Sequence, residues 1–236
     1  MKRSLIYYLY PVEGEMLRFN IQMLSKYWKL FNYRKLICIA TDNRSMTFEQ
    51  ASKYLKDQGI SGADFLCKNN SRRNGEAEYL LELLQHLTKS NDDEIVFYAH
   101  AKGVCRKRPV KVLKTWISCM YGANLNDLKL IESCFEEHDC AGTFRFKSNK
   151  GSSTPWFYAG NFYWFKSSAL FNKYHWHKID IKNKKRWAAE QYIGSVIPIE
   201  KSAEVGYPFP GWGPSMYTEE AYTNIGIPLY GAADWA

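Results

Sequence analysis

The chain has 236 residues, a formal net charge of +8 and 46% hydrophobic residues. This composition excludes an intrinsically disordered chain and predicts a folded protein with a substantial core. The basic charge favours a partner that carries phosphates or an anionic membrane surface, and a solvated basic surface explains it equally well.

Six cysteines occur without metal-binding spacing, and we interpret them as reduced thiols of a cytosolic protein. The first residues do not resemble a signal peptide, and no apolar run approaches the length of a membrane span. We therefore expect a cytoplasmic protein. Its basic segments at 106–108 and 182–186 add the expectation of a loose, peripheral association with an anionic membrane.

The first half of the chain is predicted to alternate strands with helices. Runs rich in Ile, Val, Leu and Tyr predict strands, and apolar residues at helical spacing predict helices. The strands are expected at 4–10, 35–40, 63–67 and 94–99, and the helices at 13–29, 47–58 and 76–89. This alternation predicts an α/β fold with a mostly parallel sheet flanked by helices on both faces.

The second half is predicted to be less regular and richer in aromatic side chains. Its expected elements are helices at 110–124, 126–137 and 184–196 and strands at 140–146 and 158–165. Pro and Gly become frequent after residue 198, so the C-terminal residues are expected to be mostly irregular. No linker or repeat interrupts the chain, and residues 1–236 are therefore expected to form a single domain.

The stretch Glu94–Gly103 is the centre of the predicted sheet. Residues 95–99 are continuously apolar, as expected for a parallel strand that is covered on both faces. Ligands of open α/β sheets bind beyond the carboxyl ends of such strands. His100 and Lys102 are therefore expected at the mouth of a crevice, where Gly103 lets the backbone turn close to a ligand.

Residues at the other strand ends are expected to line the same crevice: Tyr10, Pro11, Asp42, Arg73 and Asn74. Asp42 could accept hydrogen bonds from a base or ribose, and it could equally be a turn or cap residue. Arg73 and its neighbour Arg72 could bind phosphate, although charged loop residues are more often simply solvated. Lys102 is the better phosphate candidate, and His100 could be a ligand, a donor to phosphate or a satisfied polar residue.

The order of these elements, together with two later segments, resembles the GT-A nucleotide-sugar glycosyltransferases. The two segments are the aromatic stretch Tyr158–Leu170 and the stretch Trp187–Ile193. In addition, Tyr98–Gly103 is similar to segments of bacterial and viral polysaccharide-type transferases. The resemblance spans residues 4 to about 198 and implies one GT-A-like, Rossmann-like domain, with a nucleotide-binding half at 1–103 and an aromatic-rich acceptor-binding half at 104–236.

The implied reaction moves a sugar from a nucleoside-diphosphate sugar to a glycan or lipid-linked acceptor. The family carries Asp-x-Asp after the central strand to hold a divalent metal, and this chain has His100-Ala101-Lys102 there. Carboxylate oxygens suit Mg²⁺ or Mn²⁺, whereas a lysine repels them. We therefore expect no cofactor and no metal ligand, with Lys102 as the cation that neutralises the leaving diphosphate, and the use of Mn²⁺ or Mg²⁺ stays open.

The resemblance also implies roles for residues of the second half. It makes Glu190, at the start of a helix, the general base of an inverting reaction. Without the resemblance, Glu190 would be interpreted as an exposed glutamate paired with the basic residues of 182–186. The acceptor is expected to lie beside Tyr158, Gly160, Asn161 and Trp187.

Two other functions fit the sequence: a non-catalytic nucleotide- or nucleic-acid-binding module, and an inactive transferase fold that has lost Asp-x-Asp. The basic charge supports the binding module. However, the aromatic residues form one late block instead of alternating with basic residues, and no nucleic-acid-binding signature appears. We therefore expect no nucleic-acid partner.

Overall fold

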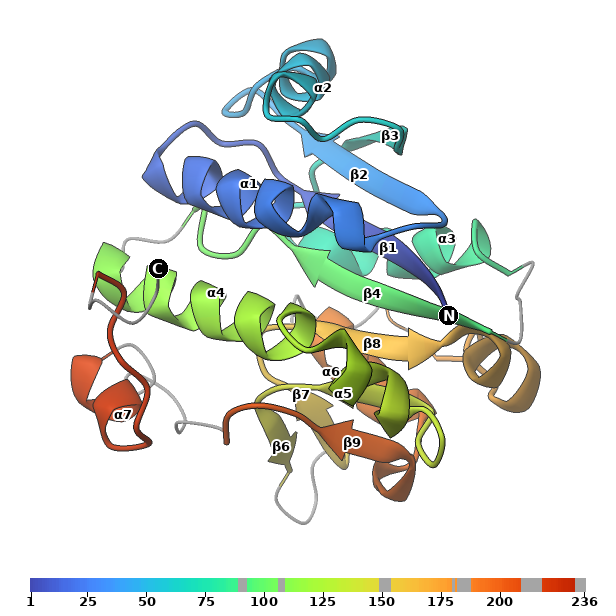
Figure 1. Ribbon diagram of the computed structural model, residues 1–236. Helices are drawn as coiled ribbons and strands as arrows, with labels where there is room; N and C mark the ends of the chain where they lie inside the picture. The colour runs from blue at the N-terminus through green and yellow to red at the C-terminus, as the bar shows by residue number, and fades with distance from the viewer. Residues whose placement is uncertain are drawn as a thin grey trace.

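A seven-stranded sheet carries the fold in this computed structural model (Figure 1), which describes residues 1–88, 93–105, 109–148, 154–179, 181, 188–208 and 218–231. Its strands are β1 (Lys2–Leu9), β2 (Lys35–Thr41), β3 (Asp64–Asn69), β4 (Glu94–His100), β5 (Cys140–Gly142), β8 (Tyr163–Lys166) and β9 (Ser202–Glu204). They lie in the order β3-β2-β1-β4-β8-β5-β9. The first four are mutually parallel, whereas β8 is antiparallel to both of its neighbours and β9 is parallel to β5.

The remaining elements cover the two faces of this sheet or form a small hairpin beside it. The α-helices are α1 (Glu15–Tyr27), α2 (Phe48–Asp57), α3 (Leu80–Gln85), α4 (Val110–Leu125), α5 (Leu128–Cys134), α6 (Ala188–Val196) and α7 (Glu219–Thr223). Short turns of helix are η1 (Trp28–Leu30), η2 (Gly75–Glu78), η3 (Ala169–Lys173) and η4 (Ile199–Lys201). The hairpin pairs β6 (Arg145–Lys147) with β7 (Trp156–Tyr158).

Strand β1 shows how the sheet separates two hydrophobic cores. The side chains of β1 point alternately to the two faces of the sheet. Tyr7 and the residues two positions before and after it pack in the core that includes α1 and α4, and these two helices cross the near face of the sheet in Figure 1. Ile6 and Tyr8 pack in the second core, with α3 and α6. Strand β4 is buried on both faces from Glu94 to Ala99, which confirms the prediction made from its continuous apolar run.

The expected fold class is confirmed, and several expected boundaries are wrong. The single helix expected at 76–89 is η2 followed by the short α3, with Tyr79 between them at φ −114° and ψ −3°. The strand expected at 140–146 is interrupted before β6, where Phe144 adopts φ 56°. The helix expected at 184–196 begins at Ala188 in the described residues, and 182–187 lie outside them.

The most consequential difference concerns the strand expected at 158–165. It is two strands, β7 and β8, which are joined by a turn at Gly160 and Asn161. Both residues have left-handed backbone conformations, with φ 91° and 61°. Glycine and asparagine are the residues that adopt this region most readily, so the local sequence accounts for the turn. The turn brings the backbone of Gly160 to the carboxyl end of β4.

Two further sequence predictions concern the cysteines and membrane spans. All six cysteines lie in the described residues and all are free thiols. None of the helices in the described part of the chain combines the length and the apolar character that crossing a bilayer requires.

Candidate active site

A cleft of about 330 Å³ opens at the carboxyl ends of β1 and β4. Its size lies at the lower end of the range for small-molecule sites. Polar and charged side chains from both halves of the chain share the lining with tyrosines. The lining includes Tyr8, Tyr10, Arg44, Asn70, Arg72, Glu76, His100, Lys102, Gly103 and Glu190.

Lys102 is held at this cleft by its backbone and by its side chain. The buried side chain of Asn20, on α1, accepts a hydrogen bond from the Lys102 N–H at 3.0 Å and donates one to the Lys102 carbonyl at 2.9 Å. The Lys102 ammonium lies 4.7 Å from the centre of the Trp116 ring, on α4. The loop after β4 therefore places a nearly buried cation at a fixed point, with only 7% of the side chain exposed.

The partner of this cation is Glu190, in the first turn of α6. The Lys102 Nζ lies 3.6 Å from the Glu190 Oε1, and the Glu190 side chain is 12% exposed. The same oxygen accepts a hydrogen bond from the Gly160 N–H at 2.5 Å. Helix α6 packs directly on β7, because Gly194 has no side chain where a Cβ would lie 1.7 Å from the Trp156 carbonyl oxygen. Glu190 is therefore fixed by its helix and by the Gly160 turn.

A second carboxylate, paired with a histidine, lies next to the first pair. The Glu76 carboxylate, on η2, lies 3.0 Å from the Nδ1 of His100, and the His100 Nε2 donates to the Gly160 carbonyl at 3.0 Å. Burial alone would raise the pKa of Glu76, but the charge and hydrogen bond of His100, with the charge of Lys102, lower it overall. The floor of the cleft thus places the Glu76 carboxylate beside His100 and the Glu190 carboxylate beside Lys102.

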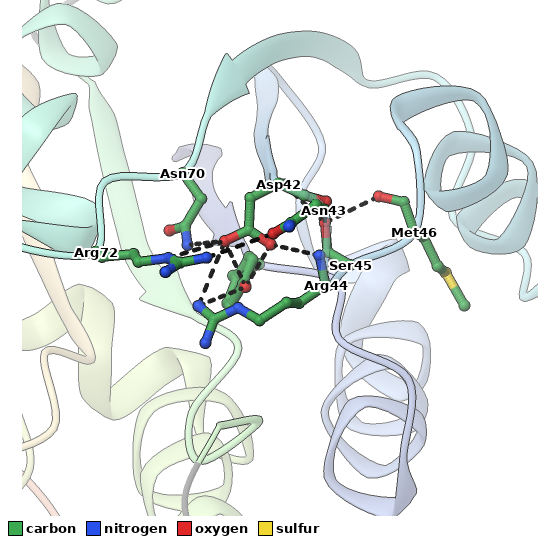
Figure 2. A network of polar contacts seen from close by, with 8 residues as sticks. Asp42, Asn43, Arg44, Ser45, Met46, Asn70 and Arg72 are labelled. Carbon is green, nitrogen blue, oxygen red and sulfur yellow. Dashed lines mark hydrogen bonds and ion pairs between the residues drawn. The ribbon is translucent and has the colours of Figure 1, made fainter.

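Asp42, at the end of β2, is the centre of a hydrogen-bond network at the rim of the cleft (Figure 2). Its carboxylate accepts hydrogen bonds from the Tyr10 hydroxyl at 2.8 Å and from the Asn70 amide at 3.0 Å. The backbone N–H of Arg44 donates to it at 2.9 Å, and the Arg72 guanidinium lies 3.9 Å away. Asp42 is therefore largely occupied by protein donors, and the exposed guanidinium groups of Arg44 and Arg72, which line the cleft, pair with its carboxylate.

This network sets the charge of Asp42. Burial acts to raise the pKa of its carboxyl, but the hydrogen bonds from Asn70, Arg44 and Tyr10 outweigh burial and hold the pKa well below its usual range. Burial, together with the hydrogen bond to Asp42, raises the pKa of Tyr10. The tyrosine therefore keeps its proton and remains a donor to the carboxylate.

The position at the carboxyl end of β4 carries His100, Ala101 and Lys102, and none of these is a carboxylate. Among the described residues, no group of three or more His, Cys, Asp or Glu side chains could hold a metal ion. The two carboxylates of the cleft floor, Glu76 and Glu190, are each paired with a cation of the protein. Asp93 precedes β4 and lies at the opposite end of that strand, where its backbone pairs with Lys2.

The cleft brings together a majority of the residues predicted for the donor and for catalysis. Tyr10, His100, Lys102, Gly103 and Glu190 line it. Asp42 lies at its rim through its bond to Tyr10. Gly160 reaches the floor through its backbone, and the Asn161 side chain contributes to lowering the pKa of Glu76.

Other predicted residues lie elsewhere. Pro11 is buried and binds the backbone of Met46. Arg73 is exposed and Asn74 bonds Glu78, so neither lines the cleft, and Arg72 does so instead.

Tyr158, which was predicted for the acceptor, does not line the cleft either. Tyr158 is fully buried because it packs beside Trp156 and Tyr163, and its hydroxyl bonds the Ala203 carbonyl. It therefore belongs to the core. Trp187 lies outside the described residues.

The residues of the site that were not predicted include Glu76, Arg44 and Asn70. Glu76 lies in a segment that the sequence assigned to an ordinary helix, and only the η2 turn directs it to His100. Arg44 comes three residues after the end of β2, and Asn70 comes directly after β3. The rule that ligands bind beyond the carboxyl ends of parallel strands would have found both of them.

Comparisons with known proteins give neither a family nor a relative: no family model and no curated protein matches the sequence. Among solved structures, the chain is similar to a 4-diphosphocytidyl-2C-methyl-D-erythritol synthase, with 13% identity, a TM-score of 0.42, and coverage of 87% of this chain and 89% of that one. It is also similar to the Francisella tularensis 2-C-methyl-D-erythritol 4-phosphate cytidylyltransferase (IspD), with 12% identity, a TM-score of 0.43, and coverage of 87% of this chain and 91% of that one.

A third similar structure is S. aureus TarS, residues 1–349, in complex with UDP-GlcNAc. Here the identity is 12%, the TM-score 0.41, and the coverage 94% of this chain and 64% of that one. At these identities and TM-scores the three proteins do not decide what this chain does. Its function is inferred below from its own residues.

Proposed function

We propose that this chain is a glycosyltransferase that uses a nucleoside-diphosphate sugar and a fixed lysine in place of a metal ion. One observation carries the proposal: Lys102 and Glu190 form a nearly buried pair at the floor of a cleft beyond the carboxyl ends of parallel strands. A fixed cation for the leaving diphosphate and a carboxylate for the acceptor proton are the groups that such a transfer requires.

In the proposed reaction, Lys102 binds the diphosphate of the donor. The bond between the anomeric carbon and the phosphate oxygen breaks, and negative charge develops on the leaving diphosphate. Asn20 holds the backbone of Lys102, and the Lys102 ammonium lies over the ring of Trp116. A cation fixed in this way stabilises the developing charge without having to reorganise during the reaction. Arg44 and Arg72 at the rim add positive charge for the rest of the nucleotide.

Glu190 serves as the general base for the acceptor. It removes the proton from the acceptor hydroxyl as the oxygen forms its bond to the anomeric carbon. In this single displacement the acceptor oxygen attacks opposite the leaving diphosphate, and the configuration at the anomeric carbon inverts. The Gly160 N–H directs the carboxylate, since it bonds one of its two oxygens. When the diphosphate takes Lys102, the Glu190 carboxylate loses its cationic partner and becomes available as a base.

The acceptor in this proposal is a glycan or a lipid-linked sugar that enters beside Gly160 and Asn161. Peripheral association with an anionic membrane would bring the protein to a lipid-linked acceptor. A cosedimentation assay with anionic and neutral vesicles tests that association. Equal recovery of the protein with both kinds of vesicle would reject it.

A donor-turnover assay tests the proposal. The protein is incubated in EDTA with a panel of nucleotide sugars and candidate glycan acceptors, and release of the nucleoside diphosphate is measured. We expect release with one donor, and loss of release in Lys102→Met and Glu190→Gln. Release that requires added Mn²⁺ would reject the role of Lys102, and no release with any donor would reject the transferase.

A non-catalytic nucleic-acid-binding module is the second candidate, since the chain carries a net charge of +8. Binding to a phosphate backbone weakens steeply as salt is raised, whereas binding of one nucleotide in a cleft depends on salt only weakly. The salt dependence of binding to an oligonucleotide and to a nucleoside diphosphate therefore separates the two candidates.

A further inference from the structure

The protonation of His100 follows from its two neighbours. The His100 Nδ1 lies 3.0 Å from the Glu76 Oε2, and the His100 Nε2 lies 3.0 Å from the Gly160 carbonyl oxygen. A carbonyl oxygen and an ionised carboxylate can only accept hydrogen bonds, whereas a neutral imidazole has one donor and one acceptor. Both contacts are hydrogen bonds only if the ring carries a proton on each nitrogen.

The other possible position for this proton is the Glu76 carboxyl. The Tyr98 hydroxyl donates to the Glu76 Oε2 at 3.4 Å, which stabilises the ionised form. The positive charge of Lys102 also favours the ionised form of the Glu76 carboxylate. The carboxylate is therefore ionised and the proton lies on the ring. Its removal from His100 would leave two acceptors facing each other at 3.0 Å in a site where both side chains are largely buried.

The protonated ring is connected to Glu190 through Gly160. The Gly160 carbonyl accepts from His100, and the Gly160 N–H donates to the Glu190 Oε1. Gly160 and Asn161 adopt left-handed conformations, and contacts from two elements hold the position of the turn that they form. These contacts come from the end of β4 on one side and from α6 on the other.

We propose that Glu76 is a positioning residue: by keeping His100 doubly protonated, it fixes the Gly160 turn that orients the Glu190 carboxylate. The role of Glu190 as a base rests on the function proposed above, whereas the protonation of His100 does not. His100 uses both ring nitrogens on the protein, so it orients the site and does not donate to the substrate. Two further charged groups line the same cleft, Lys102 and Glu190, and they pair with each other.

The test is NMR of the ligand-free protein at neutral pH with ¹⁵N-labelled histidine and backbone. The chain has five histidines, and His100→Gln identifies the signals of His100 by their loss. In the wild type we expect both ring nitrogens of His100 to carry protons. A signal of a neutral ring, with one protonated nitrogen, would overturn the proposal.

Glu76→Ala tests the connection to Glu190. We expect its His100 ring to become neutral and the Gly160 amide resonance to shift, while Glu76→Gln keeps a hydrogen bond to the ring and restores a large part of the Gly160 shift. Glu78→Ala is the matched control, because Glu78 lies on the same turn and bonds Asn74 instead of His100. A Gly160 resonance that stays in place in Glu76→Ala, or that moves equally in Glu78→Ala, would overturn the proposal.

Kinetics separate this inference from the proposed function. With an active donor, Glu76→Ala should lower kcat on the order of 10- to 100-fold, as expected for a misplaced catalytic group, and leave the KM for the donor within about twofold. Equal kcat in Glu76→Ala and wild type would overturn the positioning role. If no donor is turned over, the proposed function fails, and the two NMR results still decide whether Glu76 holds His100 and Gly160.

Discussion

The Nζ of Lys102 lies 3.6 Å from the Oε1 of Glu190, and that oxygen also accepts the Gly160 N–H. In the ligand-free protein, the proposed base is therefore paired with the proposed phosphate-binding cation. A diphosphate that binds Lys102 must compete with Glu190. Donor binding and release of the base are thus coupled, and the donor is expected to bind before the acceptor reacts.

The first prediction concerns the cation. Lys102→Met should weaken the binding of a nucleoside diphosphate by about 10- to 100-fold, because a hydrogen bond to a charged group contributes on the order of 1.5–3 kcal/mol. Isothermal titration calorimetry in EDTA measures this affinity. Lys114→Met is the control, since Lys114 is also largely covered but pairs with Glu15 between Phe19 and Tyr230. Equal affinities of wild type and Lys102→Met would contradict the role of Lys102.

The second prediction separates binding from catalysis. Glu190→Gln should lower kcat on the order of 10²- to 10⁴-fold, the usual contribution of a general base, because an amide cannot take the acceptor proton. Donor affinity should stay the same or rise, since Lys102 loses its competing partner. Glu200→Gln, on the exposed turn after α6, is the control for a lost carboxylate. A Glu190→Gln enzyme with normal kcat would remove Glu190 from the mechanism.

The third prediction is a dependence of stability on pH. The folded-state pKa of Asp42 lies below its unfolded value, which is about 3.9, so its contribution to stability is complete above that pH and is lost as the pH falls. Asp42→Asn should therefore destabilise the protein at neutral pH, and its difference from wild type should shrink in acid. Urea denaturation at several pH values measures this.

The control for this series is Asp57→Asn, which changes an exposed aspartate at the end of α2 that pairs only with Lys53 among the bonds described. If the difference in the free energy of unfolding between wild type and Asp42→Asn stayed constant from neutral to acidic pH, the predicted effect of Asp42 protonation on stability would be wrong.

The fourth prediction concerns the packing that places Glu190. Gly194→Ala should lower the free energy of unfolding by about 1–3 kcal/mol or more, because its Cβ would lie 1.7 Å from the Trp156 carbonyl oxygen. Gly122→Ala is the matched control in helix α4, where the nearest atom is the Asn126 side-chain nitrogen at 3.3 Å. Thermal or urea denaturation measures both variants. Equal stabilities of the two would contradict the close packing of α6 on β7.

The α/β order and the position of the cleft could be predicted because they follow from local patterns. The continuous apolar run before His100 indicates a buried parallel strand, and this alone places His100 and Lys102 at its carboxyl end. The assignment of Glu190 required a resemblance, since a single glutamate at a helix start carries no signal by itself. In the structure, the Glu190 carboxylate lies next to the Lys102 ammonium.

The remaining parts of the site depend on contacts between distant residues. Glu76 lies beside His100 because η2 packs in the second hydrophobic core, and no sequence pattern specifies that packing. The turn at Gly160 and Asn161 was predictable in principle, because this pair favours left-handed backbone. The aromatic residues around it masked that signal and favoured one long strand.

A thermal-shift screen of nucleoside diphosphates and nucleotide sugars, in EDTA and again with Mn²⁺, tests most directly whether Lys102 stands in for a metal. A ligand that binds only the folded protein raises the Tm by mass action. We expect one nucleotide to raise the Tm of the wild type equally in both conditions, and to leave the Tm of Lys102→Met nearly unchanged. A rise in Tm that requires Mn²⁺, or the same rise in Lys102→Met, would contradict the proposed donor site.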